Sequence, residues 1–207
     1  MEKLVYLIRN YTPKMFDLIL PLADAVTVAL YGRRMISALK QGALTGEIQG
    51  RHATLRPLSI DDLDDLHQFL DRMPEAHLKY FRPHGFDRPS LSYILNSSAF
   101  LKYGLFVNGQ IRAYSLLKAS PAGSGFIGQL VDPAFTGIGI GKLLVHHLYW
   151  QAWLAGLKTR ATISQENQAS LRSHGAVADY QVIAELPNGY LMIEFPKGNV
   201  NPPEILL

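Results

Sequence analysis

Three glycines alternate in a stretch that follows a strand-like apolar run, and this spacing suits the binding of a phosphate group. Gly137, Gly139 and Gly141 form the repeat, and the residues from Ile140 onward have the apolar spacing of a helix. Glycines allow the backbone to come close to a ligand without side chains in the way. The unpaired N–H groups at the start of a helix attract anions. The stretch is therefore predicted to hold a diphosphate.

Two common phosphate-binding motifs do not fit this stretch. A Walker A loop requires a Gly five residues before its Gly-Lys pair and a Ser or Thr after the Lys, but Thr136 and Leu143 occupy these two positions. The dinucleotide fingerprint requires G-x-G-x-x-G and an acidic residue about twenty positions further on. Here the spacing is G-x-G-x-G, and the next strand candidate, residues 157–163, carries no acid.

The stretch resembles the acyl-CoA loop of the GCN5-related N-acetyltransferases (GNAT), usually written V-x-P-x-x-[Q/R]-G-x-G-[I/V]-[G/A]. The departure is Thr136, which stands where the family usually has Gln or Arg. In that family the backbone amides of the loop bind the pyrophosphate of coenzyme A, so the resemblance implies acetyl-CoA as the acyl donor. A glycine-rich turn before an ordinary helix is the alternative. The matching residues are Val131, Pro133, Gly137, Gly139, Ile140 and Gly141.

A second match to the family follows the next strand candidate. Asn167, Ser170 and Gly175 resemble its Asn, its Ser or Ala and the Gly of its Gly-Phe pair, although the interval is shorter and Ala176 replaces Phe. The family's Asn helps to hold the pantetheine arm of CoA, and a helix N-cap is an alternative or additional role for Asn167. Together the matches imply CoA contacts from Leu130, Val131, Thr136, Gly137, Ile138, Gly139, Ile140, Gly141, Lys142, Asn167 and Ser170.

Acetyl transfer to an amine needs a base for the amine proton, and a proton or hydrogen bond for the departing thiolate. Many GNAT members carry a Glu on the strand before the loop and a Tyr before Gly-Phe, but neither stands at the expected place here. Gln129 on that strand can orient an acceptor or a water, although it cannot act as a base. We predict His84, in an aromatic loop, as the base, because the unperturbed pKa of histidine is about 6.5. A surface histidine is the alternative, and Tyr180 or His174 is the predicted proton donor to the thiolate.

The composition is that of a globular protein. Of the 207 residues, 48% are hydrophobic and 18% are charged, which argues against a disordered chain. The net charge of +3 comes without a long basic run, so nucleic acid is not expected as a partner. No metal site is expected, because the chain has no cysteine and its histidines lack metal-binding spacing. The absence of cysteine suits a cytoplasmic location.

The predicted elements follow one another in the order β-α-α-β-β-β-α-β-α-β-β, which is that of the GNAT family. The resemblance therefore implies an α/β (α+β) fold with a mixed, mostly antiparallel central sheet flanked by helices. Asn108-Gly109 is a strong signal for a hairpin between two of its strands. The expected strands are residues 53–57, 100–107, 111–119, 125–131, 157–163, 180–186 and 190–195, and the expected helices begin near residues 59, 90, 140 and 167.

Residues 1–50 are predicted to form an additional helical segment before this fold. Their apolar stretch, residues 15–31, is interrupted by Asp17, Pro21 and Asp24. A membrane span needs about twenty predominantly apolar residues with few or no charges. The segment is therefore expected to pack on the main domain or on a second subunit, which would make a homodimer.

Peripheral contact with a membrane is the alternative for this segment, with Arg33 and Arg34 facing anionic head groups. Residues 42–50 contain three glycines and are predicted to be a linker. The acyl-CoA-binding domain is expected to span residues 51–197, and residues 198–207 a tail along the surface.

These observations predict an N-acyltransferase that moves an acetyl group from acetyl-CoA to a primary amine of a small molecule. An amino sugar is the first candidate for the acceptor, because residues 80–86 resemble the acceptor-side loop of some family members near cell-surface sugar pathways. The alternative is a non-catalytic acyl-CoA-binding module or sensor within a larger assembly, which the missing Glu and Tyr would favour.

Overall fold

The computed structural model describes residues 13–207, and a single mixed sheet forms its core. The strands are β1 (Leu44–Ile48), β2 (Arg51–Pro57), β3 (Phe100–Val107), β4 (Gln110–Ala119), β5 (Ser124–Val131), β6 (Lys158–Ser164), β7 (Gln181–Leu186), β8 (Tyr190–Glu194) and β9 (Ile205–Leu206). They lie in the order β7-β8-β6-β5-β4-β3-β2-β1-β9. The pairs β5–β6 and β1–β9 are parallel and the others are antiparallel. The predicted mixed, mostly antiparallel sheet is confirmed.

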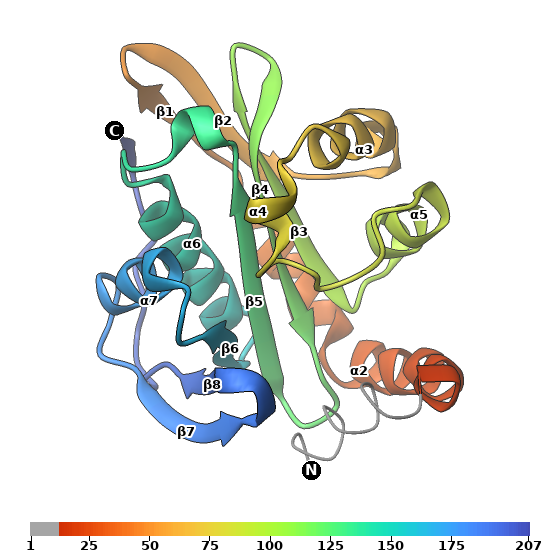
Figure 1. Ribbon diagram of the computed structural model, residues 1–207. Coiled ribbons are helices and arrows are strands. Elements are labelled where there is room, and N and C mark those ends of the chain that lie inside the picture. The colour runs from red at the N-terminus through yellow and green to blue at the C-terminus, as the bar shows by residue number, and fades with distance from the viewer. Residues whose placement is uncertain (1–12) are drawn as a thin grey trace.

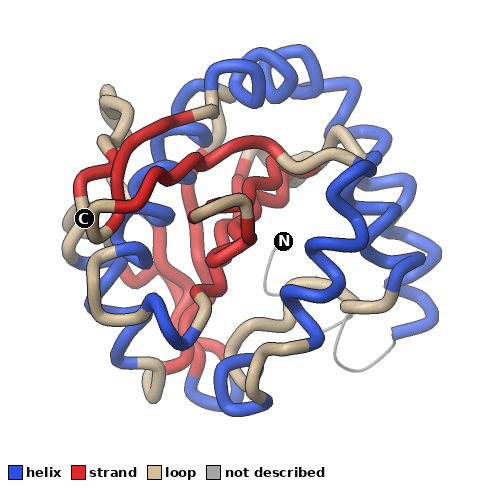
Figure 2. Tube along the Cα trace, turned by 90° about the horizontal axis from the view of Figure 1, so that it is seen from above, coloured by secondary structure: helices blue, strands red, loops and turns tan. Residues whose placement is uncertain are grey.

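Helices cover both faces of this sheet (Figure 1). They are α2 (Pro13–Gln41), α3 (Leu63–Asp71), α4 (Glu75–Leu78), α5 (Arg88–Asn96), α6 (Ile140–Leu154) and α7 (Gln168–Gly175). α6 and α7 cover one face, and α3, α4 and α5 the other; seen from above, the strands lie between the helices (Figure 2). Two buried apolar clusters follow from this layering. One joins Leu117 of the sheet to Leu144 of α6, and the other joins Leu116 to Leu66 of α3 and Leu91 of α5.

Local signals in the sequence account for several element boundaries. Ser59 and Asp62 form a capping box at the start of the helical turn that leads into α3, close to the helix start expected near residue 59. Asp87 caps α5 by accepting the N–H of Ser90 at 2.9 Å, so this helix begins earlier than expected. The β3–β4 hairpin turns at Asn108 and Gly109, which both have a positive φ. This confirms the predicted hairpin.

The predicted linker over residues 42–50 is wrong, because its centre is strand β1, which pairs with β2. Gly46 is there for close packing: a Cβ at this position would lie 2.1 Å from the carbonyl oxygen of Ile205. The hairpin therefore runs across the predicted boundary after residue 50. Residues 198–207 are not a simple surface tail either. Val200 and Ile205 are buried, and β9 adds a parallel edge strand next to β1.

α2 is the helix expected within residues 1–50. Its C-terminal half packs against the core on the α6 side, where Met35 and Ala38 are buried. Among the helices described, none combines the length and the apolarity that crossing a membrane would require.

Candidate functional site

The chain turns at the end of β5 through a short 3₁₀ turn, Pro133–Phe135. Asp132 starts the turn, because its Oδ1 accepts the N–H of Ala134 at 3.0 Å. The hydroxyl of Thr136 donates to the carbonyl of Pro133 at 2.9 Å. Thr136, which stands where the GNAT motif has a long polar side chain, therefore holds the turn together.

Residues 137–142, called the glycine loop below, present consecutive backbone N–H groups that have no acceptor within the described part of the chain. Gly137 and Gly139 have φ values of 79° and 97°, a region that glycine adopts without a steric penalty. Gly139 is the N-cap of α6, and it has no side chain that could satisfy the first N–H groups of the helix. The helix dipole adds a partial positive charge at this end. The geometry is that of an anion-binding site.

Two other segments border the glycine loop. A Cβ on Gly139 would lie 2.9 Å from Cδ2 of Leu207, so the residue after β9 lies against the loop. A Cβ on Gly141 would lie 3.5 Å from Cβ of Ser173, so α7 packs beside the start of α6. Lys142 on α6 and Arg172 on α7 are exposed at this end of the two helices. Both cations are therefore available to phosphate groups near the loop.

The two parallel strands β5 and β6 pair only at their first residues, over Ser124–Lys158, Gly125–Thr159 and Phe126–Arg160. Beyond these pairs the strands diverge, so residues 127–131 of β5 have no partner on β6. We call the space between residues 127–131 and residues 161–164 the wedge. Its open end leads to the glycine loop, since β5 ends there. The predicted residues Leu130 and Val131 lie along it. The backbone of Leu130 faces β4, in register with Tyr114, whereas that of Val131 faces the wedge and can accept or donate hydrogen bonds to an extended ligand.

Gln129 also lies on the wedge, but on the opposite face of the sheet from the predicted base. It pairs in register with Ser115, and the flanking residues Leu117 and Ile127 belong to the core on the α6 side. Because side chains alternate along a strand, Gln129 and Ser115 point to that side. The Ser115 hydroxyl is buried without a partner, so a hydrogen-bonding group lies beside Gln129.

His84 lies on the other face, in the loop between α4 and α5. Its Nδ1 is 2.7 Å from the carbonyl of Gly85, and its Nε2 is 3.0 Å from the Tyr114 hydroxyl on β4. A carbonyl only accepts, so Nδ1 carries the proton and Nε2 of the neutral ring accepts from Tyr114. Burial raises the pKa of Tyr114, which keeps the phenol protonated as a donor. Sequence reasoning missed Tyr114, because it is one aromatic residue within a largely apolar strand.

Aromatic rings surround His84. It packs edge-on against Phe86 and Tyr114, with ring centroids 5.6 and 5.8 Å apart. Phe81 lies against Tyr114 and reaches the wedge, because a Cβ on Gly128 would be 3.4 Å from its ring. Gly128 therefore leaves room at the point where the aromatic cluster meets β5.

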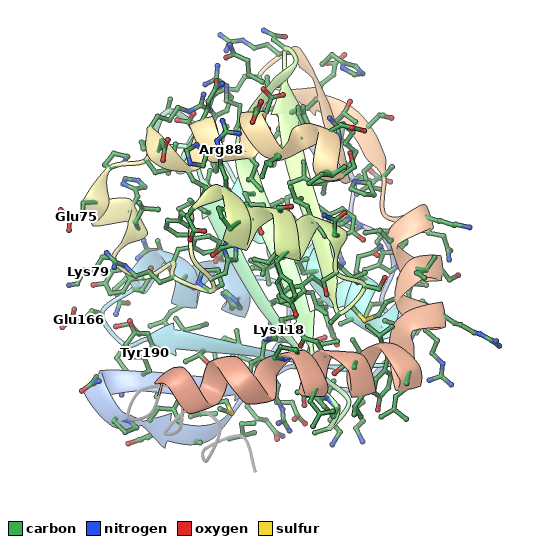
Figure 3. The ribbon with its side chains drawn as sticks, turned by 90° about the vertical axis from the view of Figure 1, so that its right-hand side faces the viewer. Glu75, Lys79, Arg88, Lys118, Glu166 and Tyr190 are labelled. Atoms are coloured by element: carbon green, nitrogen blue, oxygen red, sulfur yellow. The ribbon has the colours of Figure 1, made fainter. Side chains whose placement is uncertain are left out.

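Glu166 connects the His84 side of the site to the segment that leads into α7. Its Oε2 accepts from Lys79 Nζ and from the Tyr80 hydroxyl, each at 3.1 Å. Figure 3 shows Lys79 and Glu166 next to each other at the edge of the molecule. The hydrogen bond from Lys79 lowers the pKa of Glu166, with further lowering by Tyr80. This three-residue bridge links the two sides of the wedge at the protein surface.

Asn167 and Ser170 shape the start of α7. Oδ1 of Asn167 accepts the N–H of Ser170 at 3.0 Å, which confirms the N-cap role. The carbonyl of Ser170 accepts from the Ser173 hydroxyl at 2.9 Å and from His174 Nδ1 at 2.8 Å. The cap occupies only the oxygen of the Asn167 amide, so its NH₂ group is still compatible with a ligand contact.

The two other predicted catalytic residues lie at the closed end of the wedge, around Phe195. The rings of His174 and Tyr180 are 6.0 and 6.2 Å from that of Phe195, whose N–H donates to Thr159. Burial lowers the pKa of His174 to about 4. The ring is therefore neutral, its one N–H donates to Ser170, and its Nε2 is buried without a partner. The structure does not bring these residues next to His84.

Known structures, and not known sequences, identify this architecture. No family model matches the chain, and no curated protein matches it in sequence. In the residues that the structure describes, no group of three or more His, Cys, Asp and Glu side chains could hold a metal ion.

Solved structures do match the fold. The GNAT domain of S. lividans PAT is 17% identical with a TM-score of 0.66, covering 75% of this chain and 97% of that one. The ribosomal-protein-S5-alanine acetyltransferase from Vibrio fischeri is 14% identical with a TM-score of 0.60, covering 77% and 100%. AAC(6')-Ib in complex with paromomycin and acetyl-CoA is 22% identical with a TM-score of 0.53, covering 69% and 93%. The chain has the GNAT fold.

Proposed function

We propose that this chain is an acetyl-CoA-dependent N-acetyltransferase that acetylates the primary amine of a small molecule. The observation that carries the proposal is the row of unpaired N–H groups over residues 137–142, at the open end of the wedge. A diphosphate bound there would direct the rest of CoA along β5. The GNAT fold supports this assignment, since AAC(6')-Ib, which has it, has been solved with acetyl-CoA.

Different residues around the glycine loop would bind the diphosphate, the pantetheine arm and the thioester of acetyl-CoA. The amides of residues 137–142 would bind the diphosphate, and Lys142 and Arg172 are placed to meet phosphate oxygens. The unpaired edge of β5, at Gln129 and Val131, would hydrogen-bond the amides of the pantetheine arm, and Leu130 would line its path. The NH₂ group of Asn167 could add a contact from α7. The thioester would then lie deep in the wedge, towards Phe126.

The reaction in this site is nucleophilic attack of the neutral amine on the thioester carbonyl. The new C–N bond forms, the C–S bond breaks, the amine loses one proton, and the CoA thiolate gains one. His84 is the proposed acceptor of the amine proton at Nε2, after its bond from Tyr114 is released or reversed. Tyr180 is the proposed donor to the thiolate. The only N–H of neutral His174 is already bound to Ser170, so a supporting role suits His174 better.

An amino sugar is the proposed acceptor. The aromatic rings around His84 offer flat apolar surfaces of the kind that pack on sugar rings, and the carboxylate of Glu166 lies at the rim. The aminoglycoside acetyltransferase AAC(6')-Ib has been solved with paromomycin and with kanamycin, and aminoglycosides contain amino-sugar rings. We keep the cytoplasm as the predicted location, because the chain has no cysteine for disulfides. A homodimer formed through the N-terminal segment is the competing prediction for that segment.

The test has two parts. Calorimetric titration with CoA should give saturable binding, and thiol release from acetyl-CoA should depend on an amine drawn from a panel of amino sugars, polyamines and amino acids. An enzyme releases thiol in proportion to acetylated product identified by mass spectrometry. No binding of CoA would refute the donor site, and therefore the function.

The second candidate is a non-catalytic acyl-CoA-binding module. One observation favours it: β5 carries Gln129 and no carboxylate, so the strand before the loop supplies no general base. Tight binding of CoA without thiol release on any amine of the panel would support the module. Turnover that is lost in a His84→Gln variant would exclude it.

A further inference from the structure

Residues 21–30 of α2 have their polar residues inside and their apolar residues outside. Asp24 and Thr27 are buried beneath the helix. Oδ2 of Asp24 accepts from the Tyr93 hydroxyl of α5 at 2.6 Å, and its Oδ1 lies 3.9 Å from Lys118 Nζ of β4. Figure 3 shows Lys118 where α2 crosses the end of the sheet. These contacts fix which face of α2 points inward.

The outward face is apolar along one line. Leu22, Val26 and Leu30 are 69%, 42% and 59% exposed, and their spacing of four residues places them one above the other on the helix. A helix on a water-soluble surface normally shows the reverse polarity. We call Leu22, Val26 and Leu30 the outer stripe of α2.

The second half of the helix is basic, and it turns steeply away from the first half (Figure 3). Arg33 and Lys40 lie on this second half, and both are exposed. Within residues 21–41 the only carboxylate is that of Asp24, which is buried, so the exposed side of this segment is cationic. Arg34 points elsewhere: its Nη1 lies 2.9 Å from the Cβ position of Gly156. The sequence-based expectation that Arg33 and Arg34 share one face therefore does not hold.

From this arrangement we infer that α2 docks on the surface of a membrane that contains anionic lipids. The outer stripe would enter the boundary between head groups and acyl chains, and Arg33 and Lys40 would meet the head groups. A second copy of this chain is a poorer occupant, because pairing the same faces would bring two sets of cations together without a carboxylate. The glycine loop lies at the far end of the molecule from the first half of α2, which carries the outer stripe, so docking there leaves the donor site open (Figure 1).

Co-sedimentation of the full chain with large unilamellar vesicles tests this inference. Vesicles of phosphatidylcholine with about a third phosphatidylglycerol should bind the protein, and 0.5 M NaCl should weaken the binding. Pure phosphatidylcholine should bind it at least tenfold less. Equal binding to both vesicles, or none to either, would overturn the inference.

Two sets of variants test whether α2 is the part of the chain that binds the vesicles. The double variant Val26→Ser with Leu30→Ser should lower the partition coefficient by at least about tenfold. The matched control is Val182→Ser with Ile183→Ser, which removes two exposed apolar side chains from β7 and should bind like the natural chain. Arg33→Gln and Lys40→Gln should each lower binding to the anionic vesicles about fivefold. Unchanged binding in the α2 variants would contradict the assignment.

Light scattering in solution tests the alternative that a second copy of this chain, and not a membrane, lies on the outer stripe. A monomer without vesicles agrees with the membrane surface. A dimer that becomes a monomer in the Val26→Ser, Leu30→Ser variant would show that a second copy covers the outer stripe, and would overturn the inference. Circular dichroism of each variant should match the natural chain, because all the substituted side chains are exposed.

Discussion

At the scale of single residues, the hydrogen bonds of His84 decide how it can take part in proton transfer. The carbonyl of Gly85 holds the proton on Nδ1, and the Tyr114 hydroxyl occupies Nε2. The proposed base is therefore oriented before a substrate arrives, and its Nε2 already has a partner. Tyr114 acts as a positioning residue: once Nε2 is protonated, the phenol oxygen can turn to accept from it.

His84→Gln should lower kcat by about 10²- to 10⁴-fold, because it removes the proton acceptor. Tyr114→Phe should have a smaller effect on kcat and should change its pH profile, since the ring loses its orienting partner. Steady-state kinetics with calorimetric CoA affinities would separate these roles. Neither variant should alter CoA affinity, and a His84→Gln enzyme with normal kcat would remove His84 from the mechanism.

Gly137 and Gly109 form a matched pair of glycines for testing the donor site. Their φ values are 79° and 75°, and a Cβ on either would meet no atom within 4 Å. Alanine at each position should cost a similar stability, about 1–2 kcal/mol for a left-handed residue. Gly137→Ala should in addition weaken CoA binding by at least tenfold in calorimetry, whereas Gly109→Ala should not. Equal CoA affinity in the two variants would argue against the glycine loop as the diphosphate site.

His147 makes stability depend on pH. Its Nε2–H donates to the carbonyl of Gly42 at 2.8 Å, and burial lowers its pKa from 6.5 to about 4. The unfolded chain therefore takes up the proton first, and stability falls as the pH drops from about 6.5 to about 4, by as much as about 3 kcal/mol. Above pH 6.5 the contribution of His147 is fully present.

Urea unfolding at pH values between about 4 and 7 measures this dependence. His147→Leu should be less stable at neutral pH, because Gly42 loses its donor, but its stability should fall less steeply with acid. His174, which is buried with a similarly lowered pKa, contributes to the slope that remains, together with His146 and the carboxylates whose pKa is lowered. A variant with the same slope as the natural chain would contradict the assignment to His147.

At the scale of elements, the aromatic loop before α5 and the segment before α7 are joined by the bridge of Lys79, Tyr80 and Glu166. Both charged side chains are exposed, so the bridge adds little to global stability. The bridge instead fixes the position of the two loops relative to each other across the wedge.

Glu166→Gln should therefore raise KM for the amine several-fold and leave the melting temperature nearly unchanged. The exchange of charges in Lys79→Glu with Glu166→Lys should restore part of the lost affinity if the bridge itself matters. Kinetics with varied amine and saturating acetyl-CoA would measure this. A swapped variant no better than Glu166→Gln would point to direct contact between Glu166 and the substrate instead.

The elements also show what the sequence can and cannot predict. The helix start near residue 59, the turn at Asn108-Gly109 and the helix start at Ile140 follow from local signals, and each is confirmed. β1 was missed, because Gly46 looks like a flexible linker residue until the strand that packs on it is known. Tyr114 was missed for a similar reason: its partner, His84, is thirty positions away.

At the scale of the whole molecule, the edge of the sheet farthest from β7 reaches the donor site. β9 pairs with β1, and the following residue, Leu207, lies against Gly139. Backbone hydrogen bonds between Leu207 and both Glu47 and Gln49 hold it in place. The glycine loop is thus supported by a strand that comes after the rest of the fold.

Leu207→Ala should weaken CoA binding several-fold, because a loop held in its binding conformation loses less entropy when the ligand arrives. Leu206→Ala is the control, since that side chain is exposed and the two changes remove the same atoms. Calorimetry with CoA would compare them. Equal affinities would show that the contact with Gly139 does not support the loop.

The position of Leu207 also couples two parts of the chain that are distant in sequence. If the last strand favours the ligand-ready loop, then an occupied loop must favour the attached strand to the same degree, because the coupling free energy between two events is reciprocal. Amide protons in β9 and β1 would then exchange with deuterium more slowly when CoA is present. Slower exchange at this edge of the sheet would then report that the glycine loop is occupied.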